Sequence, residues 1–450
     1  MREPSSDPAN LQQIDSLIEA RWIVPVEPEN VVLVNHALAI DRGEIAAILP
    51  IEQARQCYRA KQTTVLAQHV LLPGLVNLHT HAAMSLLRGY ADDKPLMAWL
   101  KDHIWPAEAK HVSAQFVRDG TLLAAAEMLR GGVTCFSDMY FFPEAAAQAA
   151  LEAGIRVALG LVVFEFPSAY GSDADDYLAK GLAIRDQLHE EPRISFCLAP
   201  HAPYTVSDRT FERLAILAAQ LDIPIHTHLH ETQQEIEESL RHYGMRPLHR
   251  LQRHGIIGPN LIAAHCVHLT DDEIGLLAEQ GVTIAHCPTS NMKLASGIAR
   301  IQEAKKQGIN IGLGTDGAAS NNRLDMFQEM RHAALLGKVA AMDASALPAY
   351  QVLRMATLNG ARALGLENRI GSLLPGKLAD LCAVSFEDSM LQPCFDPISH
   401  LVYVAGRESV SHVWVGGEQR LIDATLVCPN MTVLKELAAL WQNSLCAAKH

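Results

Sequence analysis

The stretch PGLVNLHTHAAM, from Pro73 to Met84, places two histidines, His79 and His81, at the end of an apolar run. Successive side chains of a β-strand point to opposite faces, so these two imidazoles would project from the same face at the end of one buried strand. Neutral imidazoles in that arrangement are suited to binding a metal ion. Histidine pairs with this spacing also occur in ordinary cores and on surfaces, so other residues of the chain are needed to establish whether this pair binds a metal ion.

Similar segments recur along the chain, as short apolar β-rich runs that alternate with helical patterns. Counting the first, the predicted strands cover residues 74–81, 133–138, 156–163, 194–201, 224–230, 261–266, 282–288 and 310–316. Several are apolar without interruption, which is typical of parallel strands buried on both faces. One of the intervening helices is predicted over 270–281, where Thr270 and Glu273 have capping-box spacing and Gly281 ends the run.

This alternation predicts an α/β fold, a (β/α)8 TIM-type barrel. The alternative is a doubly wound sheet, and the G-x-G-x-x-G turn that often follows its first strand is absent after residues 74–81.

The two flanks of the chain have a different pattern. Residues 20–70 contain VVLVNHALAIDRGEIAAILP, which predicts a hairpin with DRGE as its turn, and residues 370–425 contain strand–turn–strand patterns. Each flank is too small to stand alone, so we expect them to pair into one small β-sandwich. The predicted organisation is 1–69 for its first part, 70–369 for the barrel, and 370–450 for its second part with a terminal helix over 431–445.

The bulk composition indicates a soluble globular protein. The chain has 450 residues, 49% of them hydrophobic, and a mean hydropathy of +0.06. A formal charge of -13 and a pI near 5.9 argue against nucleic acid or an anionic membrane as a partner. The first residues, MREPSSDPANLQQ, are polar and predict neither a signal peptide nor a membrane span. Nine cysteines without a C-x-x-C pair indicate reduced thiols and a cytoplasmic location.

Residues that can bind a metal or carry a proton stand at the ends of several predicted strands. They are His79, His81, His201, His226, His228, His230, His265, His286 and Asp316. The carboxyl ends of barrel strands meet at one mouth, so these side chains should converge. Three imidazoles and one carboxylate are a suitable ligand set for Zn²⁺ or Fe²⁺. His226, His228 and His230 share one parity, so spacing leaves open which of them faces the barrel. The strand 194–201 has no lysine to bridge a second ion, which predicts one metal.

Five motifs carry a resemblance to a known family. In this order, PGLVNLHTH, HTHLHET, AAHCVHL, AHCPTSNMKLASG and GLGTDGAASNN resemble the amidohydrolase superfamily, within its mononuclear deaminase and chlorohydrolase branch. The segment MSLLRGYADDKPLMAWLKDHIWPAEAK, residues 84–110, is similar to that of the 5-methylthioadenosine/S-adenosylhomocysteine deaminases. The resemblance covers nearly the whole chain.

The resemblance implies roles for particular residues. The implied ligands of one divalent metal ion, zinc or iron(II), are His79, His81, His228 and Asp316. The implied catalytic residues are Glu231, which protonates the substrate ring, His265, which acts on the hydrolytic water, and Asp316, which takes the proton of that water. The implied substrate-binding residues are Glu108, His201, Glu231, Asp316 and Trp105, the last within an apolar wall that also includes Leu96, Met97 and Trp99. His226, His230, His268 and His286 are interpreted as structural.

The implied activity is hydrolytic deamination of adenosine-type nucleosides: 5′-methylthioadenosine, S-adenosylhomocysteine and adenosine. The main alternative is a deaminase or chlorohydrolase acting on another heterocycle, such as guanine or an s-triazine; Glu108 favours a nucleoside because a carboxylate matches a ribose diol. The H-x-E…P-C-x-x-C pattern of zinc cytidine deaminases is absent. A non-enzymatic scaffold is disfavoured because the whole ligand set is present. Subfamily members often have an arginine after the third strand, and LGLVVFEFPSAYGSD offers none, which leaves the preferred 5′ substituent open. The resemblance also allows a homo-oligomer.

Overall fold

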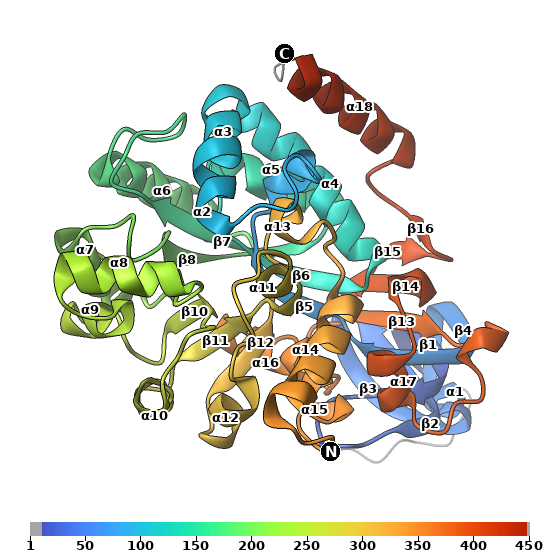
Figure 1. The fold of residues 1–450 in the computed structure, drawn as a ribbon. Helices are drawn as coiled ribbons and strands as arrows, with labels where there is room; N and C mark the ends of the chain where they lie inside the picture. The colour runs from blue at the N-terminus through green and yellow to red at the C-terminus, as the bar shows by residue number, and fades with distance from the viewer. Residues whose placement is uncertain (1–10, 448–450) are drawn as a thin grey trace.

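A computed structural model describes residues 11–447 of the chain (Figure 1). All eight strands predicted for the barrel are present, and they pair in parallel and in chain order. They are β5 (Leu75–Thr80), β6 (Val133–Asp138), β7 (Arg156–Val163), β8 (Ile194–Pro200), β9 (Ile225–Leu229), β10 (Leu261–His265), β11 (Thr283–His286) and β12 (Asn310–Leu313). The predicted (β/α)8 barrel is confirmed.

The barrel closes where β12 meets β5. The backbone N–H of Asp316 donates to the carbonyl of His79 at 2.9 Å, and the N–H of Thr315 donates to Asn77 Oδ1 at 2.9 Å. A Cβ on Gly314 would lie 2.7 Å from the Cβ of His79, so only glycine permits this approach. The closure brings the end of the last strand beside the end of the first.

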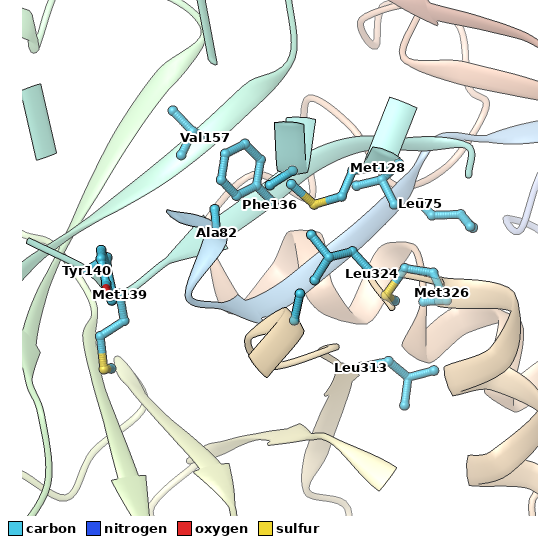
Figure 2. Packing of buried hydrophobic residues seen from close by; sticks show 14 of the residues in the cluster. Leu75, Ala82, Met128, Phe136, Met139, Tyr140, Val157, Leu313, Leu324 and Met326 are labelled. Carbon is cyan, nitrogen blue, oxygen red and sulfur yellow. The ribbon is translucent and has the colours of Figure 1, made fainter. Parts of the chain in front are cut away.

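Helices follow the strands, and most of them cover the outside of the barrel. They are α4 (Ala114–Arg130), α5 (Pro143–Ala153), α6 (Ala174–Leu188), α7 (Asp208–Leu221), α8 (Gln233–Tyr243), α9 (Pro247–Arg253), α10 (Asp271–Glu279), α11 (Pro288–Lys293), α12 (Ile301–Lys306), α13 (Ala318–Asn321), α14 (Met326–Ala341), α15 (Ala349–Met355) and α16 (Leu358–Ala363). Thr270 and Glu273 form the predicted capping box at the start of α10. Apolar side chains of α4 and of the strands, including Met128, Phe136 and Leu75, form the core between helix and barrel (Figure 2).

Between β5 and β6 the chain makes a long helical excursion, for which the sequence analysis predicts no elements. It consists of the 3₁₀-helix η2 (Ala82–Leu87), α2 (Leu96–Trp99), the π-helix η3 (Leu100–Ile104) and α3 (Trp105–His111). Side chains of α2, η3 and α3 line the same cavity as residues at the strand ends. This excursion therefore covers the mouth of the barrel.

Both chain ends build the second unit, as predicted. Its strands are β1 (Gln12–Ile23), β2 (Leu33–Asp41), β3 (Glu44–Pro50), β4 (Tyr58–Pro73), β13 (Leu381–Ser385), β14 (Val410–Val415), β15 (Glu418–Ile422) and β16 (Thr425–Leu426), with α1 (Ile51–Cys57) after β3. They form one continuous sheet, in which β4 pairs with β13 and joins the two ends of the chain. The sheet curves so that Leu38 and Ile40 of β2 share a buried cluster with Trp414 of β14. The predicted hairpin is present, with Arg42 and Gly43 in its turn at φ of 50° and 81°.

Specific side-chain contacts join the barrel to the second sheet and to the C-terminal helix. Arg156 on β7 forms a buried ion pair with Asp380, at 2.6 Å between Nε and Oδ2, and this links the barrel to the second sheet. The C-terminal helix α18 (Met431–Ala447) confirms the helix predicted over 431–445, and the indole of Trp441 donates to Asp119 of α4 at 2.9 Å. The short helix α17 (Pro397–Tyr403) lies between β13 and β14 in the chain.

Residues 1–10 and 448–450 lie outside the described part, including most of the polar stretch for which no signal peptide is predicted. Within residues 11–447, no helix combines the length and the apolar character that crossing a bilayer requires.

Candidate metal centre and active-site cavity

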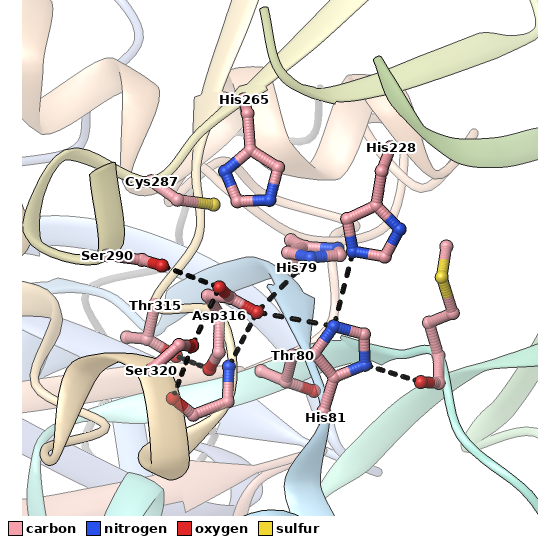
Figure 3. A network of polar contacts seen from close by, with 12 residues as sticks. His79, Thr80, His81, His228, His265, Cys287, Ser290, Thr315, Asp316 and Ser320 are labelled. Carbon is pink, nitrogen blue, oxygen red and sulfur yellow. Dashed lines mark hydrogen bonds and ion pairs between the residues drawn. The ribbon is translucent and has the colours of Figure 1, made fainter. Parts of the chain in front are cut away.

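Four side chains from the ends of three strands converge at one mouth of the barrel (Figure 3). Nε2 of His81 lies 3.2 Å from Asp316 Oδ1 and 3.3 Å from His228 Nε2, and Nε2 of His79 lies 3.5 Å from the same Asp316 oxygen. His79 and His81 belong to the end of β5, His228 to β9, and Asp316 follows β12. These four side chains are the ones that the resemblance implies as metal ligands.

In two of these imidazoles, the Nδ1 atom is hydrogen-bonded to a backbone carbonyl. Nδ1 of His81 lies 2.6 Å from the carbonyl of Met139, and Nδ1 of His228 lies 2.6 Å from the carbonyl of His201. A carbonyl oxygen only accepts hydrogen bonds, so each Nδ1 carries the proton and each Nε2 presents a lone pair. The lone pair of His81 therefore faces both the carboxylate of Asp316 and the lone pair of His228.

His79 provides the test of whether a cation fits here. Its Nδ1 lies 3.0 Å from Nε2 of His226, while its own Nε2 is fully buried and has no hydrogen-bond partner within residues 11–447. A buried ring nitrogen without a partner is costly, and a divalent cation bound by the surrounding lone pairs and carboxylate would remove that cost. The donor set fits a metal ion. His226, interpreted as structural from the sequence, fixes the ring of His79.

Asp316 is held by three donors. Its Oδ2 accepts hydrogen bonds from the hydroxyls of Ser290 at 2.6 Å and Ser320 at 2.7 Å, and its Oδ1 accepts from the N–H of Gly317 at 2.7 Å. Burial alone would disfavour the charged carboxylate, but the nearby imidazoles of His79 and His81 hold the pKa of Asp316 well below its ordinary value. Both serines lie on short helices, α11 and α13, and neither was identified from the sequence. Ser290 belongs to a different strand–helix unit, and Ser320, four residues after Asp316, lies in a turn that no strand or helix periodicity describes.

Glu231 and His265 stand beside this group. Glu231 follows β9, its N–H donates to Glu235 Oε2 at 2.8 Å, and its Oε2 lies 3.9 Å from His265 Nε2. Nδ1 of His265 lies 2.9 Å from Asn291 Oδ1, which directs Nε2 toward Glu231. Burial raises the pKa of Glu231, with His265 opposing the change. A carboxyl group with a raised pKa can hold a proton for delivery to a substrate.

These side chains open into a cavity of about 320 Å³ between the strand ends and the α2–α3 excursion. Glu108 of α3 lies in it, and its Oε1 accepts a hydrogen bond from the hydroxyl of Tyr140 at 2.6 Å. Burial raises the pKa of Glu108 to about 7, although the hydrogen bond from Tyr140 opposes the change. Trp105, Trp99 and Leu96 line the cavity.

Met97 was expected in the same wall, and this expectation is wrong. Met97 is absent from the cavity lining and packs against the apolar core instead. Consecutive residues of a helix point about 100° apart, so Leu96 and Met97 on α2 cannot both face the cavity squarely.

The remaining histidines separate into two groups. His201 lines the cavity, its ring stacks on Phe164 at 4.6 Å between centroids, and burial lowers its pKa to about 3, so it is neutral. His230 points away from the site, where its Nε2 accepts a hydrogen bond from the N–H of Leu248 at 3.1 Å. Nε2 of His268 lies 2.7 Å from the carbonyl of Ser296, and His286 is buried at the end of β11. Of the three histidines that share a parity, His228 is the one whose Nε2 approaches Nε2 of His81.

Comparison with known proteins gives a consistent picture. Residues 70–420 match the model of the amidohydrolase family. A curated protein from Teredinibacter turnerae named 5-methylthioadenosine/S-adenosylhomocysteine deaminase is 46% identical, over 98% of this chain and 100% of the relative. A protein of the same name from Saccharophagus degradans is 45% identical, over 96% of this chain and 97% of the relative.

Two solved structures share the fold. An adenosine deaminase from Xanthomonas campestris with bound zinc superposes with a TM-score of 0.96 at 48% identity, covering 97% of this chain and 100% of the other. An atrazine chlorohydrolase from Arthrobacter aurescens, complexed with zinc, has a TM-score of 0.88 at 25% identity, with coverage of 95% and 99%.

Proposed function

Since this chain belongs to the amidohydrolase family and is a hydrolase that acts on carbon–nitrogen bonds, we propose that it deaminates adenosine-type nucleosides and releases ammonia. The proposed substrates are 5′-methylthioadenosine, S-adenosylhomocysteine and adenosine. The observation that carries this proposal is one cavity that reaches the metal-ligand set and is lined by a buried acid, Glu231, and by a second, half-buried carboxyl, Glu108. The names of the relatives support the same substrate class.

The proposed ligands of a zinc ion are His79, His81, His228 and Asp316. When bound there, zinc lowers the pKa of a water molecule and so supplies a nucleophile at neutral pH. The buried Nε2 of His79, which has no hydrogen-bond partner among the described residues, supports this assignment.

The chain's own residues handle the protons. Glu231 delivers its proton to N1 of the purine as the attack on C6 removes the aromaticity of the ring. Asp316 accepts the proton of the attacking water and passes it to the departing ammonia. His265, fixed through Asn291, stabilises the charge that develops on the attacking oxygen. His201, neutral and stacked on Phe164, packs against the bound substrate.

Glu108 supports a nucleoside rather than a bare heterocycle. Its carboxylate, held by Tyr140 on one oxygen, can accept hydrogen bonds from the two ribose hydroxyls on the other side. A guanine or an s-triazine offers no such diol and would leave a buried carboxyl without this partner.

A substrate panel tests the proposal. Ammonia release is measured with 5′-methylthioadenosine, adenosine, guanine and an s-triazine, before and after metal removal by a chelator and addition of zinc. We expect turnover of the nucleosides only, lost on chelation and restored by zinc. Turnover of guanine or the triazine without the nucleosides would refute the proposal in favour of the other heterocycle class.

The cellular context is proposed with the activity. All nine cysteines are free, which supports a location in the reducing cytoplasm. Self-association of the chain is proposed as well, and light scattering of the purified protein measures it.

A further inference from the structure

A row of aromatic rings runs from the candidate metal centre to the outer end of the cavity. The ring of His201 lies 4.8 Å from that of His228, and Phe164 stacks on His201 at 4.6 Å. Phe166 follows at 5.0 Å from Phe164, and Trp105 of α3 lies 6.1 Å from Phe166. The row therefore connects the barrel mouth with the α2–α3 excursion.

The outer end of this row meets solvent. His201 and Phe164 lie deep in the cavity, whereas the side chain of Phe166 is 39% exposed. The loop after β7 continues the wall with Pro167 and Ala169, which are also apolar. A substrate whose purine ring lies near Glu231 and His228 would therefore extend its far end along aromatic and aliphatic surface.

The charge of the cavity is one-sided. Its ionisable lining residues are the carboxyl groups of Glu108, Glu231 and Asp316 together with histidines, and within the described chain no lysine or arginine lines it. A carboxylate entering the outer end would find no cationic side chain there.

We propose that this aromatic outer end, Trp105 with Phe164 and Phe166, selects adenosine derivatives with a small, uncharged, apolar 5′ substituent over those with a zwitterionic one. The inference rests on the proposed function and narrows it. The preferred substrate is 5′-methylthioadenosine, and S-adenosylhomocysteine is a poor one.

The physical reason is the difference in desolvation. A methylthio group gains apolar burial and sulfur–aromatic contact with the rings of the row. The amino-acid end of S-adenosylhomocysteine would lose water from its carboxylate and ammonium without a charged partner for the carboxylate. Contacts of this kind change kcat/KM by about 10-fold or more.

The experiment compares kcat/KM for 5′-methylthioadenosine, adenosine and S-adenosylhomocysteine in the wild-type metal-loaded protein and in two variants. Phe166→Arg adds a cation at the half-exposed outer end, where a charged side chain can be solvated, and Phe166→Leu is the matched control that keeps the wall apolar. We expect the wild type to prefer 5′-methylthioadenosine over S-adenosylhomocysteine by about 10-fold or more. Phe166→Arg should lower that ratio by about 10-fold, and Phe166→Leu should change it by less than about 3-fold.

Each outcome has a distinct meaning. Equal or better turnover of S-adenosylhomocysteine by the wild type would overturn the inference and leave the proposed function intact. A preference that Phe166→Arg does not change would overturn the assignment of selectivity to this end of the cavity. Failure to release ammonia from all three nucleosides would refute the proposed function, and the inference with it.

Discussion

Replacing Tyr140 with phenylalanine tests how the ionisation of Glu108 affects substrate binding. The hydroxyl of Tyr140 donates to Glu108 Oε1 at 2.6 Å, and both side chains lie in the cavity. Burial raises the pKa of Glu108 to about 7, and this hydrogen bond holds it from rising further. Tyr140→Phe removes the bond but keeps the ring, so the carboxyl should keep its proton to higher pH.

The size of the effect follows from the strength of the bond. A hydrogen bond to a charged group contributes about 1.5–3 kcal/mol, which moves a titration midpoint upward by about one to two pH units. At about pH 7.5 the ionised fraction of Glu108 should then fall by about 3-fold to 25-fold. If ionised Glu108 binds the ribose, KM rises by that factor, while kcat stays within about 2-fold because Glu108 takes no part in the chemistry.

The assay is ammonia release from 5′-methylthioadenosine between about pH 6 and about pH 9.5. For the wild type, KM should fall as pH rises through about 7, because the carboxyl ionises there. For Tyr140→Phe the same decrease in KM should occur at higher pH, so the KM values of the two proteins should become similar near about pH 9.5. The matched control is Tyr170→Phe, since the Tyr170 hydroxyl is buried and makes no hydrogen bond within the described residues. A KM increase that is equal at every pH, or a loss confined to kcat, would refute the role of Glu108 ionisation.

Three further predictions concern other parts of the site. Glu231→Gln should lower kcat by about 10²–10⁴-fold and retain zinc, because it removes the proton donor and leaves the ligands intact; near-full activity would contradict the assignment. Ser290→Ala removes one of the two hydroxyls on Asp316 Oδ2 and should weaken zinc binding by about 10-fold, measured by competition with a chelator; unchanged affinity would show that the serine does not orient the ligand. Glu329, buried behind the site, has a pKa raised to about 8 by burial, so the folded protein keeps a proton that the unfolded chain releases above about 4.5. The wild type should therefore lose stability as pH rises between those values, at about 1.4 kcal/mol per pH unit. Glu329→Gln has no such ionisation, so its melting temperature should rise relative to that of the wild type over this pH range. A difference between the two melting temperatures that stays constant with pH would contradict the raised pKa.

The predicted strands were recovered because their signal is local. A strand buried on both faces is apolar throughout, and a His-x-His pair at its end needs only the period of two to share a face. The capping box of α10 and the hairpin turn at Arg42 and Gly43 are also set by neighbouring residues. Each of these features could be predicted without knowing which strands lie side by side.

The hydrogen-bond partners that hold the side chains of the candidate site could not be predicted in this way. Ser290 meets Asp316, Tyr140 meets Glu108, and His226 meets His79, in each case across elements that are separate in the chain. Such contacts depend on strand register, on helix rotation and on how the excursion after β5 folds over the mouth. The misplaced Met97 has the same origin, because the rotation of α2 is decided by packing.

The amino-acid sequence alone determined the alternation of strands and helices, the residues that end each strand, and through their resemblance the chemistry of the centre. Strand parity left His226, His228 and His230 equivalent, and the resemblance selected His228. Tertiary structure alone decided how that ring meets His81, and that the outer end of the cavity is aromatic and uncharged. The reason is physical: burial and backbone period act on neighbours in the chain, whereas the position of a side chain in a shared cavity depends on how all eight strands close around it.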